Sequence, residues 1–322
     1  GLGNFFEDFI KAHVRLFVPL ALIVTLVLVG LKVPQTLEPM RAVQTLGGGV
    51  QQIPLGPVAS LESIKHLGTN GGGFFGVNSA HPFENPSPLT NVIEILSMWT
   101  ISAALPYTFG RFARNNKQGW MIFSVMMTLF VAFLCLTYFS EKAGNPLINQ
   151  LGINSSAGSM EGKEVRFGIA QSALFTTVTT AATTGSVNNM HDTLTPLGGL
   201  APLAEMMLNV VFGGKGVGFV NMIMYAILGV FICGLMVGRT PEFLGRKIEA
   251  REMKLIAVAI LMHPFIILAP TAISFMTHLG TDAFSNPSYH SLSQSLYEFT
   301  SSAANNGSGF EGLADNTVFW NV

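Results

Sequence analysis

Three short polar segments rich in glycine interrupt an otherwise apolar chain, and they resemble one another. Residues 179–186 (TTAATTGS) align without a gap on residues 301–308 (SSAANNGS), and residues 69–72 (TNGG) fit the same frame. The copies lie roughly 115–120 residues apart, which indicates a repeated unit. Glycine tolerates positive φ and leaves the backbone uncovered, so main-chain carbonyls can replace the water shell of a cation such as K⁺. These segments therefore suggest the binding of a dehydrated cation by backbone oxygen atoms.

The candidate ligands form three turns, named here by their residue ranges. The 69–73 turn comprises Thr69, Asn70, Gly71, Gly72 and Gly73; the 183–187 turn comprises Thr183, Thr184, Gly185, Ser186 and Val187; the 305–309 turn comprises Asn305, Asn306, Gly307, Ser308 and Gly309. In an alternative interpretation, their small residues only let helices pack closely. Three copies, each after a short helical segment, favour a cation selectivity filter.

The composition indicates a membrane protein. Charged residues make up 11% of the chain, against about 25% in soluble domains, and hydrophobic residues make up 49%. A surface with so few charges must face lipid over much of its area. The net charge of −1 and the absence of a long basic run argue against nucleic acid as a partner.

Apolar stretches of two lengths alternate along the chain. Five are long enough to cross a bilayer: residues 12–31, 92–109, 120–139, 219–237 and 255–276. Three shorter helical segments, 56–67, 167–182 and 291–304, each precede a turn and fit half-helices that enter partway. We therefore expect an all-α polytopic membrane protein built from repeated helix–re-entrant pore loop–helix units.

This pattern divides the chain into units at residues 1–119, 120–254 and 255–322. The last unit has no closing span, so we expect the natural protein to continue past residue 322. Eight Lys and Arg residues lie in the loops after the second and fourth spans, which places those loops in the cytoplasm by the positive-inside rule. All three turns then enter from the outside.

One apolar region, residues 201–238, is too long for one span, since a single helix would reach about 55 Å. A glycine-rich break divides it, formed by Gly213, Gly214, Lys215, Gly216 and Gly218. A lysine within a membrane usually marks a functional site, here a gate below the filter. The alternative is that Lys215 lies near an interface and extends its ammonium to water.

The three turns and their surroundings resemble those of one family. Residues 68–75 (GTNGGGFF) with 78–86 (NSAHPFENP) are similar to the second filter of the potassium-translocating A subunits of Kdp-type K⁺-transporting ATPases, the KdpA family. Residues 179–192 and 301–307 resemble its third and fourth filters, and residues 238–245 (GRTPEFLG) resemble its cytoplasmic loop between the third and fourth units. That family has four units around one pore, as in the K⁺ channel and Trk/Ktr/HKT superfamily, so its first filter should precede residue 1.

The resemblance implies that ion selection and ATP hydrolysis are carried out by different subunits of one complex. This subunit would select and admit K⁺ in the bacterial or archaeal cytoplasmic membrane, while a P-type ATPase B subunit hydrolyses ATP and a C subunit and a small F subunit complete the complex. The chain would then not be catalytic itself, in agreement with the absence of a phosphate-binding loop and of an Asp-Lys-Thr-Gly motif. Arg239, at the start of the cytoplasmic loop, would face the ion tunnel or the ATPase subunit, or would simply anchor the loop.

Two other functions remain open at this point. A gradient-driven K⁺ transporter of the Trk/Ktr/HKT type would use the same filter chemistry. An intramembrane hydrolase would use the acidic and imidazole groups that follow the turns: His81, Glu84, His191 and Asp192. The same four groups fit an electronegative vestibule or caps that hold the returning chain; a metal site is less favoured because they share no ligand spacing on one helix.

Overall fold

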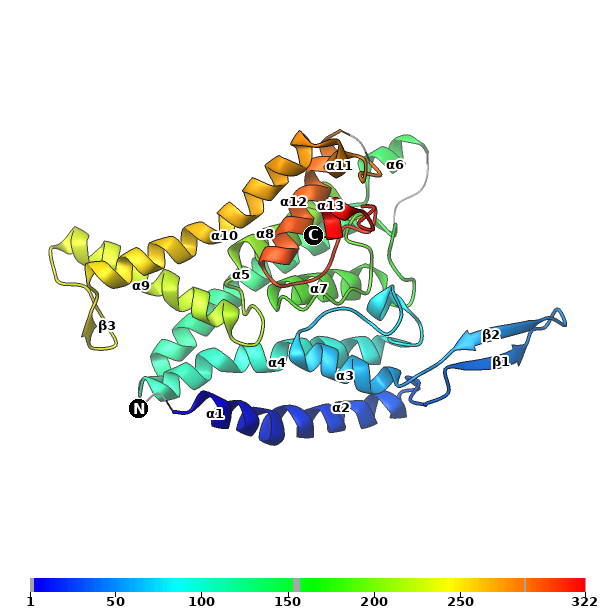
Figure 1. Ribbon diagram of the computed structural model, residues 1–322, viewed down its shortest axis with the longest axis horizontal. Coiled ribbons are helices and arrows are strands. Elements are labelled where there is room, and N and C mark those ends of the chain that lie inside the picture. Colours follow the sequence, from blue (N-terminus) through cyan, green and yellow to red (C-terminus); the bar gives the residue numbers. More distant parts are fainter. Residues whose placement is uncertain (1–2, 153–156, 287, 322) are drawn as a thin grey trace.

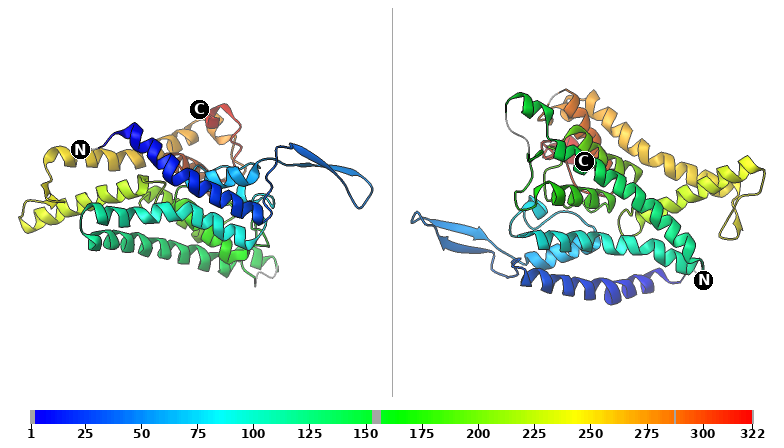
Figure 2. Two further views of the ribbon diagram at one scale, coloured as in Figure 1. Left: turned by 90° about the horizontal axis from the view of Figure 1, so that it is seen from below. Right: turned by 180° about the vertical axis from the view of Figure 1, so that it is seen from behind.

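The structure is a computed structural model that describes residues 3–152, 157–286 and 288–321. It is mostly helical, with long helices and shorter ones packed side by side and a hairpin projecting at one end (Figures 1 and 2). Five helices of the described residues are long and apolar enough to cross a membrane. The predicted class of helical membrane protein is therefore supported.

The long helices cover the five predicted spans to within one residue. The first consists of α1 (Phe5–Ala12), a π turn (His13–Phe17) and α2 (Val18–Gly30) in one continuous run. Pro19 cannot donate a backbone hydrogen bond, and the wider π turn just before it accommodates this loss. The others are α4 (Pro88–Phe112), α5 (Asn116–Ala143), α9 (Val217–Val237) and α10 (Ala250–Met276).

Three shorter helices stand where half-helices were expected: α3 (Val58–Gly68), α7 (Gly168–Ala181) and α12 (Tyr289–Ala303). The longest has 15 residues and so reaches about 22 Å, less than a hydrocarbon core of about 30 Å. Each packs against long helices: α3 against α2 and α4, α7 against α4 and α5, and α12 against α10. α3 ends directly at the 69–73 turn, and α7 and α12 each end one residue before their turns.

The prediction of an all-α fold omitted two antiparallel β-hairpins, which occupy segments expected to be loops. Strands β1 (Met40–Gln44) and β2 (Val50–Pro54) form the projecting hairpin, and β3 (Glu242–Phe243) and β4 (Arg246–Lys247) form a small one. The remaining elements are α6 (Pro146–Gln150), α8 (Pro196–Leu208), α11 (His278–Thr281), α13 (Val318–Asn321) and a 3-10 turn (Asn78–Ala80). A glycine-rich turn closes β1–β2, and Gly48 has the positive φ that this connection needs.

The two ends of the molecule differ in charge, as the topology requires. The α4–α5 turn, the β3–β4 hairpin and the N-terminus lie at the left of Figure 1, and β1–β2 lies at the right. The left end carries the basic residues counted in the sequence, among them Arg111, Arg114 and Lys117. A membrane placed across the long helices therefore separates a basic side from the side that bears β1–β2.

The largest buried cluster lies where α4, α5 and α7 meet the break between α8 and α9. Phe212, in the middle of this break, is fully buried. Its ring meets Trp99 edge to face at 5.3 Å and Phe123 at 5.6 Å between centroids. The break is consequently anchored in the core on one side and leads to the turns on the other.

Candidate functional site

The three turns share positive φ at two positions that the sequence alignment places in the same frame. The first residue of each turn has positive φ: 50° at Thr69, 45° at Thr183 and 56° at Asn305. Two residues later, φ is again positive at the aligned glycines Gly71, Gly185 and Gly307. Since non-glycine residues rarely adopt positive φ, its recurrence at aligned positions is strong evidence that the turns are equivalent.

The backbones of the turns converge. A Cβ atom added to Gly71 would lie 2.5 Å from the carbonyl oxygen of Thr184 and 3.1 Å from that of Asn306. A Cβ added to Gly185 would collide with the same Asn306 carbonyl. Glycine is therefore required at both positions by space as well as by φ. Carbonyl groups of the 183–187 and 305–309 turns thus pack against the glycines of neighbouring turns. Several backbone oxygens gathered at one place suit the binding of a dehydrated cation.

Two cavities flank the turns. The outer one, about 670 Å³, is lined by Gly185, Val187 and residues 307–309, together with acidic side chains that include Glu298 and Glu311. The inner one, about 230 Å³, is lined by the first residues of all three turns and by Gly214 and Lys215. The candidate ligands thus lie between a wide acidic hollow and a small polar one.

The glycine break lies directly beneath the turns. Gly214 donates its N–H to the Thr183 hydroxyl at 2.8 Å and accepts a hydrogen bond from Ser102 at 3.0 Å. Gly213 and Gly218 approach so closely that a Cβ on either would strike the other's backbone. The break therefore connects the 183–187 turn to α4.

Lys215 is partly buried and lines the inner cavity. Its ammonium donates to the Met98 carbonyl of α4 at 2.8 Å. It thus extends across the inner mouth of the turns rather than into open solvent. Arg239, by contrast, is exposed beyond the C-terminus of α9, at the basic end of the molecule.

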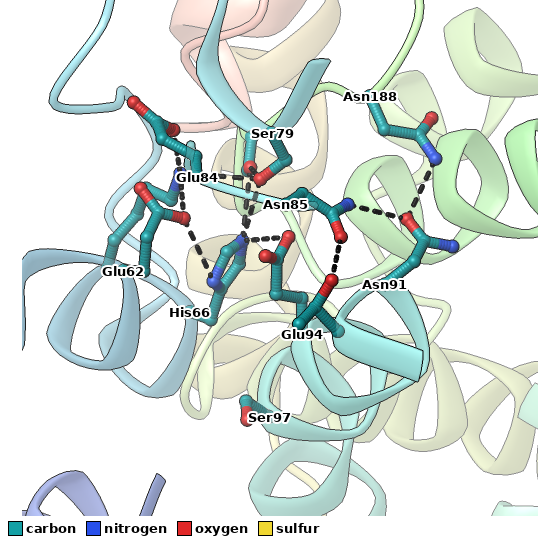
Figure 3. Close-up of polar contacts among 12 residues, drawn as sticks. Glu62, His66, Ser79, Glu84, Asn85, Asn91, Glu94, Ser97 and Asn188 are labelled. Carbon is teal, nitrogen blue, oxygen red and sulfur yellow. Dashed lines mark hydrogen bonds and ion pairs between the residues drawn. The ribbon is translucent and has the colours of Figure 1, made fainter. Parts of the chain in front are cut away.

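A buried charged cluster supports the 69–73 turn, and the sequence analysis did not single it out except for Glu84 (Figure 3). The Lys65 ammonium lies 2.6 Å from Glu62 and 3.3 Å from Glu84. Glu84 accepts the backbone N–H of Phe75, and a Cβ on Gly73 would contact the Glu84 carboxylate. Glu84 therefore holds the returning chain of this turn. The spacing of Glu62, Lys65 and His66 on one helical face was a signal available in the sequence.

A different, mostly uncharged network supports the 305–309 turn. The Tyr297 hydroxyl lies 2.9 Å from Ser308 Oγ and 2.6 Å from His191 Nδ1. The Asn306 side chain donates to the Thr179 carbonyl of α7 at 2.9 Å. Glu298 accepts the backbone N–H of Phe310 at 2.7 Å. The turn is therefore tied both to its own half-helix and to the preceding one.

Two acidic groups of the outer cavity, Glu298 and Glu311, have raised pKa values. Burial raises the pKa of Glu298 to about 7 and, likewise, that of Glu311 to about 7. Glu311 accepts the backbone N–H groups of His191 at 3.0 Å and Asp192 at 3.2 Å, which partly offsets this shift. The outer hollow therefore becomes more negative as pH rises through neutrality.

The four groups considered for a hydrolase have separate surroundings. His81 stacks on Phe75 with 3.9 Å between centroids, and partial burial lowers its pKa. Glu84 pairs with Lys65, His191 contacts Tyr297, and Asp192 lies 2.7 Å from His290. Nothing in these contacts resembles a nucleophile with its base. Glu84 and the backbone at His191 instead hold the returning chain.

Comparison with known proteins places the whole chain in one family. The model of the family described as "Potassium-transporting ATPase A subunit" matches residues 1–322. The chain belongs to this KdpA family. It is 67% identical over 321 residues to a protein of Geobacillus kaustophilus (strain HTA426) named "Potassium-transporting ATPase potassium-binding subunit". The match covers all of this chain and 57% of that relative. The family assignment does not favour the gradient-driven alternative.

Proposed function

We propose that this KdpA chain provides most of the K⁺ site in a subunit of an ATP-driven, high-affinity potassium uptake complex. The observation that carries the proposal is the convergence of three turns that share positive φ at two aligned positions, with the carbonyls of Thr184 and Asn306 packed against Gly71. The name of the relative from Geobacillus supports K⁺ as the bound ion. The complex would lie in the cytoplasmic membrane of a bacterium or an archaeon, which the five candidate spans support.

Each part of the site has a role in dehydrating and admitting K⁺. The acidic outer cavity concentrates cations, and the carbonyls of the 69–73, 183–187 and 305–309 turns then replace water around the ion. The half-helices α3, α7 and α12 end at the turns, so their negative dipole ends favour a cation there. A further turn, from a unit outside this chain, would complete the ring as in the four-unit architecture of the K⁺ channel and Trk/Ktr/HKT superfamily.

The glycine break controls passage below the filter. Gly213, Gly214, Lys215 and Gly216 lie between α8 and α9, Gly218 lies in the first turn of α9, and the Lys215 ammonium borders the inner cavity. A positive charge at this point opposes the exit of K⁺ until the break moves. The hydrogen bond from Gly214 to Thr183 couples such a movement to the 183–187 turn.

Energy comes from a partner, in this proposal. A P-type ATPase B subunit uses ATP, with C and F subunits completing the complex, and this chain carries no reaction of its own. Arg239 is exposed shortly before the β3–β4 hairpin, where a cytoplasmic partner subunit would meet it. Affinity purification of the assembled complex tests this assignment, since a soluble nucleotide-binding ring in place of a P-type ATPase would point to the gradient-driven class.

Alanine substitutions in the turns test the filter. Gly71→Ala and Gly185→Ala place a methyl group against carbonyls of neighbouring turns, whereas a Cβ at Gly199 makes only an ordinary 3.7 Å contact with Leu194. We expect the first two variants, in the complete subunit and its complex, to lose growth rescue of a K⁺-uptake-deficient bacterium at micromolar K⁺. Gly199→Ala should rescue normally. Retention of K⁺-over-Na⁺-selective uptake by both turn variants would refute the filter.

A further inference from the structure

The hydroxyl of Ser186, in the 183–187 turn, is held by the unit before it. His66 Nε2 of α3 lies 3.1 Å from Ser186 Oγ, and Ser79 Oγ lies 3.0 Å from the same atom. All three side chains are almost completely buried, with exposed fractions of 0% or 1%. These hydrogen bonds span more than 100 residues of sequence and join two repeats at the candidate filter.

The His66 ring is itself held on several sides. Its Nδ1 lies 3.6 Å from Glu62 and its Nε2 lies 3.6 Å from Glu94 of α4 (Figure 3). The Phe175 ring of α7 meets the imidazole edge to face at 6.3 Å and 88°. Contacts from α3, α4 and α7 thus set the ring orientation, so the nitrogen that faces Ser186 has little freedom to move.

The cluster of Glu62, His66 and Glu94 has ligand atoms within 4.8 Å of one another, which raises the question of a metal ion. Two features favour a positioning role. The Lys65 ammonium, 2.6 Å from Glu62, already supplies a cation to this cluster. The imidazole also presents its two nitrogens to different carboxylates, whereas a bound metal would take one nitrogen and draw both carboxylates to it.

We propose that His66 is a positioning residue for ion selectivity: it fixes Ser186 and thereby sets the spacing between the 183–187 turn and the 69–73 turn. This proposal rests on the filter assignment made above. Because the Thr184 carbonyl packs against Gly71, a shift of the turn that carries Ser186 changes the distance between their oxygen atoms. K⁺ and Na⁺ differ in size, so a loosened spacing weakens the preference for the larger ion.

The aligned position in the other turns shows why this contact is distinctive. Ser308 is held by Tyr297 of its own half-helix at 2.9 Å, and Gly72 has no side chain to hold. The three aligned positions are thus Gly72, Ser186 and Ser308. Among the described residues at these positions, only Ser186 forms a hydroxyl hydrogen bond to the half-helix of a different unit. His66 therefore controls the spacing between units rather than the shape of one turn.

Three variants and one control test the proposal in the complete complex. His66→Leu and Ser186→Ala each remove the hydrogen bond, and we expect each to weaken K⁺-over-Na⁺ discrimination by roughly tenfold, since a buried hydrogen bond lost with its partner unsatisfied has effects of that order. His66→Gln keeps a hydrogen-bonding nitrogen near the place of Nε2 and should retain most of the discrimination. His263→Gln alters a partly buried histidine of α10 that contacts Met206 instead of a turn, and should behave as the parent.

The measurement is uptake of K⁺ against Na⁺ competition, together with apparent K⁺ affinity and recovery of the assembled complex. The effects of His66→Leu and Ser186→Ala should not add in the double variant, since both break the same contact. If His66→Leu fails to assemble, Ser186→Ala decides, because it leaves the charged cluster intact.

Parent-like discrimination in Ser186→Ala would overturn the positioning role. Zn²⁺ bound tightly by the purified complex and lost in His66→Gln would replace positioning by metal ligation. Failure of the filter assignment has a different signature, in which Gly185→Ala as well as the His66 variants transport K⁺ like the parent.

Discussion

The 69–73 and 305–309 turns end in the same way but are supported by different chemistry. In each, the last glycine, Gly73 or Gly309, packs against a carboxylate that accepts a backbone N–H from the chain that follows. For the first turn this carboxylate is Glu84, which comes after the turn and pairs with Lys65. For the second it is Glu298, which comes before the turn, in α12.

The two carboxylates differ in whether a basic side chain lies close enough to offset a negative charge. Glu84 is fully buried, and the nearby Lys65 ammonium offsets its charge. Glu298 forms no ion pair with a basic side chain of the described residues, and burial raises its pKa to about 7. The 69–73 turn is thus supported by a carboxylate next to a buried ammonium, and the 305–309 turn by a carboxylate whose pKa is raised. The two turns therefore share their pattern of positive φ but not their supporting side chains.

The largest expected effect comes from removing the cation of the charged support. Lys65→Met leaves Glu62 and Glu84 buried without their partner, which costs about 3–5 kcal/mol in comparable buried pairs. We expect poor assembly of the complex and loss of K⁺ uptake, measured by thermal unfolding and transport. Lys142→Met, at an exposed site, should change neither, and adding Glu62→Gln to Lys65→Met should recover part of the stability. Wild-type stability in Lys65→Met would contradict a charged support.

A smaller effect is expected from the uncharged support of the 305–309 turn. Tyr297→Phe removes the hydroxyl that contacts Ser308 and His191 but keeps the ring stacked on Phe310 at 4.1 Å. The expected cost is about 1–2 kcal/mol, with a several-fold weaker apparent affinity for K⁺. The measurement is the fall in melting temperature of Tyr297→Phe relative to the parent protein, compared with the fall caused by Lys65→Met. If the two falls are equal, the two turns do not differ in the strength of their supports.

The smallest expected effect is a dependence of the apparent K⁺ affinity on pH, caused by Glu298 and Glu311. Glu298 and Glu311 have pKa values raised to about 7, so both gain negative charge between pH 6 and pH 8. Their stabilising contribution, full below the ordinary pKa of a glutamate, is lost as pH rises through about 7. The same ionisation attracts cations to the outer cavity, so we expect apparent K⁺ affinity to increase roughly threefold over this range.

Glu311→Gln tests this pH dependence, because glutamine can still accept the N–H groups of His191 and Asp192 but does not ionise. We expect the variant to flatten the affinity profile, whereas Glu7→Gln, at an exposed site in α1, should leave it unchanged. An identical pH profile for Glu311→Gln and the parent protein would show that the acidic cavity does not contribute.

Much of the architecture could be predicted from local sequence patterns. The alignment of Thr69, Thr183 and Asn305 was read from sequence similarity, and all three adopt the predicted common frame in their backbone angles. The break between α8 and α9 was predicted from the length of the apolar region and from its glycines, and the structure places it at residues 209–216, with Lys215 inside it. The β1–β2 hairpin was missed because its strands are almost fully exposed and lack the alternation that marks a half-buried strand.

The sequence alone determined which residues form the turns, because glycine, positive φ and apolar length are properties of neighbouring residues. Only the tertiary structure decided what the turns contact. The Ser186–His66 hydrogen bond, the approach of Gly71 to the Thr184 carbonyl and the cation beside Glu84 depend on how separate half-helices pack between the long helices. Buried polar groups must find partners wherever the fold brings them together, and such partners lie far apart in the chain.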